Sequence, residues 1–130
     1  MNKETHKFTV SLVNQQYYQL IIKDNIEFTV ADCKQLVAFE KEICGKLLPV
    51  LIISSPNSSA DSDLLKYISK KENNPYAKAA AYVLSTLGHK ILANFYIKVA
   101  PPERPTKFFK DKETALKWLE QYFQFICFFK

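Results

Sequence analysis

The chain of 130 residues has little glycine, arginine or cysteine, and each scarcity excludes a class of protein. Two glycines and six prolines leave no Gly-rich linker and no Gly-rich loop that would hold a phosphate, and no internal repeat is visible. No apolar run approaches the roughly 18 residues that a transmembrane segment needs. The start, MNKETHKFTV, lacks the apolar stretch of a secretory signal. The length and the 48% share of hydrophobic residues predict a single domain over 1–130 with one core.

Cysteine usage points to a reducing compartment. The three cysteines, Cys33, Cys44 and Cys127, are an odd number and form no CxxC pair, which argues against a disulfide framework. Cys33 and Cys44 lie eleven positions apart, on one face of a predicted helix, and we expect buried thiols. No group of His, Cys, Asp and Glu has metal-site spacing, so we expect no metal and no cofactor. The cytoplasm is the simplest predicted location.

Positive charge is concentrated in the second half of the chain, within a net charge of +5. Residues 1–65 carry 6 basic and 8 acidic side chains, whereas residues 66–130 carry 12 basic and 5 acidic ones. This asymmetry would suit an anionic partner. However, Arg104 is the single arginine, and bidentate recognition of phosphate favours arginine over lysine. We therefore interpret the lysines as a solvated surface and expect no nucleic-acid partner.

The first half of the chain predicts a hairpin, a helix and a central strand. FTVSLV (8–13) and YYQLIIK (17–23) flank a short polar break, as the two strands of a hairpin do. Thr29 and Asp32 have capping-box spacing at the start of a helix that Gly45 would stop. That helix would turn its charged residues, Lys34, Glu40, Lys41 and Glu42, mostly outward. LLPVLII (47–53) has no polar face and predicts a strand covered on both sides, paired from Val50 onward because Pro49 fits a ladder badly.

The polar stretch PNSSADSDLL (56–65) follows this strand directly and begins a second predicted helix. Its simplest interpretation is capping, in which Ser58 caps the helix and Asp61 occupies the capping-box position. The alternative is a surface that a partner binds or a kinase modifies, through Ser58, Ser59 and Ser62. Right-handed crossovers would place this stretch at the carboxyl edge of the sheet, where open α/β sheets usually carry their sites.

Residues 75–100 are ambiguous, because their alanines favour one long helix while Gly88 and the alternation of Ala77, Ala79 and Ala81 suit a strand followed by a helix. Three prolines then require a loop over 100–105, TKFF (106–109) predicts a short strand, and Asp111 can cap a last helix. The tail, FQFICFFK (123–130), is strongly apolar. It either extends the last helix into a groove or packs against a second subunit, and we expect a homodimer through it.

Two stretches resemble a known family: YVLSTLGHKILANFYIKVAPPERPTKFFKDKETALKWLE (82–120), and the apolar strand that runs into a polar turn at 47–65. Both are similar to the SpoIIAA-like proteins of the STAS superfamily, which is grouped with Sec14-type lipid-binding folds. The nearest likeness is to small uncharacterised bacterial proteins common in Bacteroidetes. The resemblance implies a strand at 78–85 and a helix at 87–99. The implied fold is α/β, with a five-stranded mixed sheet and four helices in the order β-β-α-β-α-β-α-β-α.

The resemblance also bears on the polar turn. Anti-sigma-factor antagonists of this superfamily carry an Asp-Ser-Ser/Thr-Gly turn after the equivalent strand, with a hydroxyl that a partner kinase phosphorylates. Asp61 and Ser62 match its first two positions, whereas Asp63 stands in place of the modified hydroxyl residue and Leu64 in place of the glycine.

We therefore expect a non-enzymatic regulatory module that docks a protein partner. The predicted docking residues are Ser58, Ser59, Asp61, Ser62 and Asp63, beside the start of the 87–99 helix. The alternative is a carrier of a lipid or small apolar metabolite, with a cavity beneath that helix lined by Phe95, Tyr96, Phe109 and Trp118. An enzyme is the third hypothesis. It is weakened because nothing in the sequence places a nucleophile and an acid beside His89.

Overall fold

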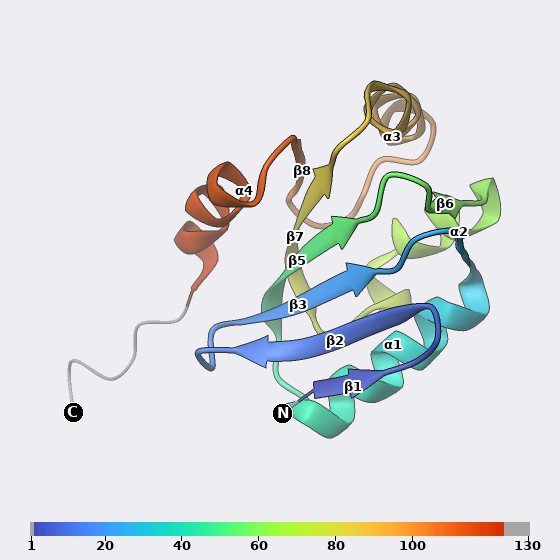
Figure 1. Ribbon diagram of the computed structural model, residues 1–130. Helices are drawn as coiled ribbons and strands as arrows, with labels where there is room; N and C mark the ends of the chain where they lie inside the picture. Colours follow the sequence, from blue (N-terminus) through green and yellow to red (C-terminus); the bar gives the residue numbers. More distant parts are fainter. Residues whose placement is uncertain (1, 124–130) are drawn as a thin grey trace.

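A computed structural model describes residues 2–123, apart from the side chain of Tyr96. Six strands form the main sheet in the spatial order β1-β2-β3-β5-β7-β8 (Figure 1). Their bounds are Asn2–Glu4 (β1), Phe8–Val13 (β2), Tyr17–Ile22 (β3), Leu48–Ser54 (β5), Ala77–Leu84 (β7) and Thr106–Phe109 (β8). The strand β2 runs antiparallel to both of its neighbours, and β3, β5, β7 and β8 are parallel. The predicted mixed α/β class is confirmed, with β1 as a sixth strand that the sequence did not suggest.

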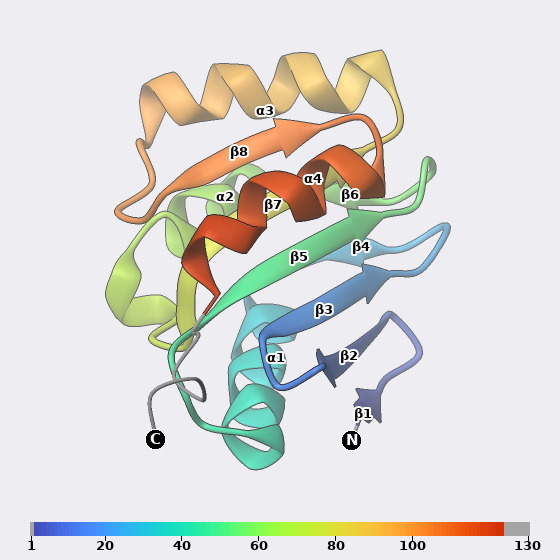
Figure 2. The same ribbon diagram turned by 90° about the vertical axis from the view of Figure 1, so that its left-hand side faces the viewer.

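Helices cover both faces of this sheet. Their bounds are Val30–Ile43 (α1), Ser62–Ile68 (α2), Leu87–Val99 (α3) and Lys112–Leu119 (α4), with 3-10 turns at Lys71–Asn73 (η1) and Glu120–Tyr122 (η2). Figures 1 and 2 place α4 on one face and α1, α2 and α3 on the other. A separate two-stranded sheet pairs β4 (Glu27–Phe28) with β6 (Ser59–Ala60). The strand at 78–85 and the helix at 87–99, which the resemblance implied, are therefore present as β7 and α3.

Local signals account for the hairpin and the first helix. Asn14 and Gln15 both adopt positive φ (52° and 59°), as the two central residues of a type I′ hairpin turn do. Thr29 and Asp32 form the predicted capping box, in which Asp32 Oδ2 accepts from the Thr29 amide at 2.8 Å. Gly45, at φ 70°, follows the helix end. A β-carbon at Gly45 would lie 3.3 Å from the Lys41 carbonyl oxygen, so glycine suits this turn.

The central strand β5 is buried on both faces, as its uniformly apolar sequence predicts. Val50 and Ile52 face a core shared with α1 and α2, while Leu51 faces the core beneath α4. Pairing with β3 begins at Val50, as predicted, whereas pairing with β7 begins two residues earlier, at Leu48. The register with β7 shifts between Leu48 and Val50, and this irregularity accommodates Pro49 without a ladder hydrogen bond from its nitrogen.

Small residues on β7 determine how closely the two layers of helices approach the sheet. Ala79 and Ala81 face α4 and pack with its buried residues Ala115 and Leu119. On the opposite face, the small side chain of Ala80 lies beneath α3, which contacts β7 and α2. Figure 1 shows α3 at the top of the molecule, next to the β8 edge of the sheet. The space between this helix and the sheet contains the candidate site.

Candidate functional site

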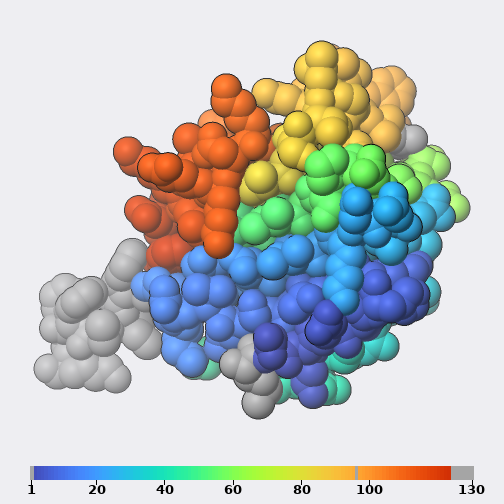
Figure 3. Space-filling model, in the orientation of Figure 1, coloured from blue at the N-terminus to red at the C-terminus, as the bar shows by residue number. Residues whose placement is uncertain are grey.

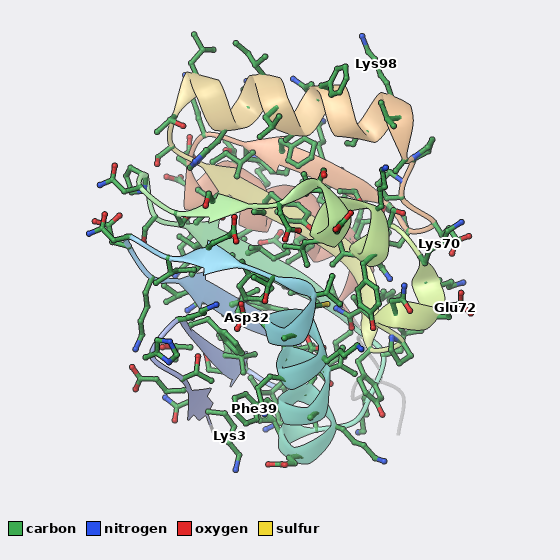
Figure 4. All side chains as sticks on the ribbon, turned by 90° about the vertical axis from the view of Figure 1, so that its right-hand side faces the viewer. Lys3, Asp32, Phe39, Lys70, Glu72 and Lys98 are labelled. Atoms are coloured by element: carbon green, nitrogen blue, oxygen red, sulfur yellow. The ribbon has the colours of Figure 1, made fainter. Side chains whose placement is uncertain are left out.

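A pocket of about 220 Å³ lies between the sheet and the helices α2 and α3. Its floor comes from β3, β5, β7 and β8, and Figure 4 views the same face of the molecule, with α3 above α2. The apolar lining includes Leu20, Ile22, Val50, Ile52, Ala80, Tyr82 and Phe108 of the strands, Leu64 and Ile68 of α2, and Leu92, Ala93 and Ile97 of α3. The pocket therefore lies where the alternative hypothesis predicted a cavity, beneath the helix at 87–99.

The helix α3 is apolar on more than one side. Leu92, Ala93 and Ile97 line the pocket, while Leu87 and Ile91 are 74% and 61% exposed. The space-filling view shows this helix at the top of the molecule, in yellow and orange (Figure 3). A helix with apolar residues on its pocket side and its outer side is typical of a binding element rather than of an ordinary surface helix.

Polar residues lie at both ends of the pocket. At the carboxyl ends of β5 and β7 they are Ser54, Ser58, Ser59 and His89. At the opposite end, where β7 and β8 begin, they are Ser69, Asn74, Arg104 and Thr106. An apolar middle with polar ends suits an amphipathic molecule.

Arg104 is buried at the second end, with 9% of its surface exposed. Its Nε donates to the Ala77 carbonyl oxygen at 3.0 Å, and Nη1 donates to that of Ile68 at 2.8 Å. Nη2 donates to the carbonyl oxygens of Asn74 at 3.2 Å and Lys70 at 3.5 Å. These four bonds hold the loop before β8 against the end of α2 and the start of β7.

Two residues that line the pocket each carry a buried polar atom without a hydrogen-bond partner among the described residues. These atoms are Oδ1 of Asn74, a residue that is 9% exposed, and Nδ1 of His89. By contrast, the Ser58 hydroxyl donates to the Ser55 carbonyl oxygen at 2.6 Å. Because a buried acceptor without a donor is costly, the unsatisfied Asn74 Oδ1 makes this end of the pocket unusual.

Glu40 is a second unusual group, on α1 below the pocket. It is fully buried, and neither carboxylate oxygen has a hydrogen-bond partner within residues 2–123. Burial raises its pKa to about 8, against the opposing attraction of Arg104. Burial likewise raises the pKa of the Cys33 thiol and of the Tyr82 hydroxyl to about 12 each. The prediction that Glu40 mostly faces outward is wrong, because it shares the inner helical face with Cys33 and Leu36.

The predicted docking residues separate into buried and exposed groups. Ser58 is buried and does not cap α2. Asp61 is the N-cap, and its Oδ1 accepts from the Leu64 amide at 2.7 Å. Ser59, Ser62 and Asp63 are exposed. The prediction that Ser58 caps this helix is therefore wrong, because the capping residue is Asp61. Three of the predicted docking side chains remain exposed to solvent.

The predicted lining residues lie elsewhere. Phe95 is on α3 and 58% exposed, and the side chain of Tyr96 is outside the described part of the chain. Phe109 and Trp118 pack on the α4 face, with ring centroids 5.8 Å apart, and so do not line this pocket.

The predicted dimer contact through 123–130 falls almost wholly outside the described residues, of which Phe123 is the last. The ring of Phe123 stacks on Tyr17 at a centroid distance of 5.5 Å.

Sequence reasoning missed Asn74, Arg104 and Glu40. Arg104 carried a signal, because it is the single arginine and lies in a proline-rich loop. Glu40 also carried one, since it follows Leu36 by four positions on the apolar face. Asn74 carried no signal beyond its place before a proline.

Among the described residues no cluster of three or more His, Cys, Asp or Glu can hold a metal. No described helix has the length and apolar character needed to cross a bilayer.

Comparison with solved structures identifies the fold. A crystal structure of an uncharacterised protein of the DUF3478 family, from Shewanella loihica PV-4, has a SpoIIAA-like fold and matches this chain with a TM-score of 0.59. The match covers 92% of this chain and 98% of that chain at 20% sequence identity. The domain therefore has a SpoIIAA-like α/β fold, and the resemblance noted in the sequence is confirmed for the fold. The chain belongs to the family described as "Domain of unknown function (DUF7793)", whose model matches residues 14–123. Among curated proteins no similar sequence was found.

Proposed function

We propose that this domain is a non-enzymatic binding module that holds a small apolar or amphipathic molecule in the pocket between α3 and the sheet. The observation that carries the proposal is the pocket itself, about 220 Å³ with a predominantly apolar lining. Ligand sites in proteins are concave and mostly apolar, with a few polar groups that fix orientation. The pocket beneath α3 has this composition.

The pocket volume limits the size of the ligand. An apolar protein cavity of about 150 Å³ binds benzene, which has six heavy atoms. By the same ratio, a pocket of about 220 Å³ takes roughly nine heavy atoms. A medium-length alkyl chain or a single substituted ring therefore fits, whereas a membrane lipid with two long chains exceeds the volume.

The polar groups around the pocket support binding rather than catalysis. Nucleophilic catalysis needs a hydroxyl or thiol within hydrogen-bond reach of a base. The Ser58 hydroxyl is already engaged with the Ser55 carbonyl, and Nδ1 of His89 has no partner within residues 2–123. Cys33, also in the lining, is a buried thiol whose pKa burial raises to about 12, so it is protonated at neutral pH.

Native mass spectrometry of protein purified gently from its own cells tests the proposal. We expect a bound small molecule on the unaltered chain. Ala93→Phe, which adds a ring to a pocket-lining position of α3, should abolish it. Asn94→Phe is the matched control, because Asn94 is the next residue of the same helix and is exposed. An empty unaltered chain, or equal occupancy in both variants, would contradict the proposal.

A second candidate function is docking of a protein partner, and the exposed surface where α2 and α3 begin favours it. Ser59, Ser62 and Asp63 are exposed there, α2 contacts α3, and Leu87 and Ile91 expose apolar side chains at the start of α3. Exposed apolar side chains edged by polar ones are typical of interaction surfaces. Glutamate at Ser59 and Ser62, with Ile91→Glu as a second variant, should remove a co-purified partner while leaving the bound small molecule in place. A partner retained by all of these variants would dispose of this candidate.

A further inference from the structure

We propose that the Arg104–Asn74 end of the pocket binds an anionic head group, so that the ligands are compact amphipathic anions such as medium-chain carboxylates. This inference rests on the proposed function, since it specifies what the same pocket holds. It assigns the polar end to the head group and the apolar middle to the hydrocarbon part.

The first argument is the buried charge of Arg104. Its four hydrogen bonds all go to backbone carbonyl oxygens, which are neutral. The ion pairs among the described residues involve Lys3, Lys7 and Lys23, and none includes Arg104. A buried cation without a counter-ion is unfavourable, and an anion that enters the pocket would relieve this cost.

Nearby carboxyl groups do not supply that counter-ion. Glu40 is buried, and its pKa of about 8 leaves it mostly protonated near pH 7. It also lies outside the pocket lining and makes no hydrogen bond among the described residues. Glu103 precedes Arg104 in sequence, but it is exposed and its Oε1 accepts from the Lys71 amide at 2.7 Å. Arg104, which lines this end of the pocket, therefore has no ion-pair partner among the described residues.

The second argument is the side chain of Asn74. This amide lines the pocket, and its Oδ1 has no donor within residues 2–123. Rotation of the amide exchanges its oxygen and NH2 group, so it can accept from a protonated acid or donate to a carboxylate. The four carbonyls also use four of the five N–H groups of Arg104. One N–H of Nη1 therefore has no acceptor among the described residues, and Arg104 and Asn74 both line the same end of the pocket.

Size and charge together select the probe. Octanoate has ten heavy atoms, close to the roughly nine that the pocket takes. 1-Octanol and octylamine have the same chain with a neutral and a cationic head group. Their comparison isolates the charge of the head group from the burial of the chain.

Isothermal titration calorimetry near pH 7 on the full chain, first freed of bound small molecules, tests the inference. We expect octanoate to bind about tenfold more tightly than 1-octanol, the ratio expected for one charge-assisted hydrogen bond, and octylamine to bind most weakly. Asn74→Asp should reduce octanoate affinity by about tenfold or more while leaving 1-octanol nearly unchanged, because only the anion is repelled by the new carboxylate. Asn94→Asp, the same exchange at an exposed position of α3, should change neither affinity.

The outcomes separate this inference from the proposed function. Equal affinities for octanoate and 1-octanol, with no effect of Asn74→Asp, would overturn the head-group site and leave the pocket as an apolar site. Tightest binding of octylamine would overturn the head-group site as well. Failure of all three probes to bind the unaltered chain would overturn both proposals. If Asn74→Asp does not fold, the ranking of the three probes on the unaltered chain decides.

Discussion

Arg104 donates from Nη1 to the carbonyl oxygen of Ile68, the last residue of α2, over 2.8 Å. The last carbonyls of a helix have no partner within the helix, and a cation near them is favourable. The loop before β8 therefore closes the end of α2 with a buried guanidinium. This contact links the stability of the domain to the polar end of the pocket.

Arg104→Lys should destabilise the domain by about 2–4 kcal/mol, because an ammonium group cannot serve the four carbonyls that the planar guanidinium serves. The measurement is urea unfolding followed by circular dichroism. Lys98→Arg, at an exposed position on α3 (Figure 4), is the control and should leave the midpoint unchanged. A midpoint of Arg104→Lys within error of the unaltered chain would show that the four bonds are dispensable.

Glu40→Gln should reduce the dependence of stability on pH. The pKa of Glu40 is about 8 in the folded chain against an ordinary value of 4.5, so the folded state binds the proton more tightly. Its contribution is therefore intact below about pH 4.5 and is lost as the pH rises toward 8, at up to about 1.4 kcal/mol per pH unit. Unfolding free energies of the variant at pH 5 and pH 8 should differ less than those of the unaltered chain. Glu42→Gln, exposed on the same helix, should keep the original difference.

Asp61→Ala should cost about 1 kcal/mol of unfolding free energy, because the Leu64 amide loses its capping acceptor at 2.7 Å. Asp63→Ala changes an exposed residue two positions further on and should lower the unfolding free energy by only about 0.3 kcal/mol. Thermal unfolding of the two variants side by side gives the comparison. Equal losses would mean that the carboxylates act through general charge rather than through the cap.

Cys33 should resist alkylation in the folded chain, since it is buried and its pKa of about 12 leaves almost no thiolate near pH 8. Cys44 is partly exposed and should react first of these two. Iodoacetamide labelling followed by peptide mass spectrometry distinguishes the sites. Both should label fully in denaturant, and rapid native labelling of Cys33 would indicate that α1 opens locally.

The sequence predicted those elements whose determinants are local. The capping box at Thr29 and Asp32 and the apolar run of β5 depend on neighbouring residues alone, so they could be interpreted without knowledge of the fold. By residue propensity, 75–100 stayed ambiguous, because its alanines favour helix while pairing with β5 makes 77–84 a strand. Such pairing is a tertiary effect, and it entered the prediction through the family resemblance.

The cavity beneath the 87–99 helix was predicted as the alternative to a docking surface, but its lining residues were not predicted. Strand alternation indicates that Phe108 and Phe109 face opposite sides of β8, but it does not tell which side carries α3. The rings of Phe109 and Trp118 were expected in the pocket, but they pack against each other on the α4 face of the sheet. The contacts of Arg104 with Ile68 and Ala77 span 36 and 27 residues, a separation that no local pattern encodes.

The order of strands also bears on how this chain acquires its structure. The strands β2 and β3 are joined by a tight turn, whereas the two strands of each of the three parallel pairs are joined by a crossover connection that contains a helix. Such long-range pairings carry a large loop-closure entropy and slow the search for the native topology. We expect refolding kinetics closer to those of mixed α/β domains than to the microsecond rates of helical bundles, with the N-terminal hairpin acquiring protection from hydrogen exchange before β7 and β8.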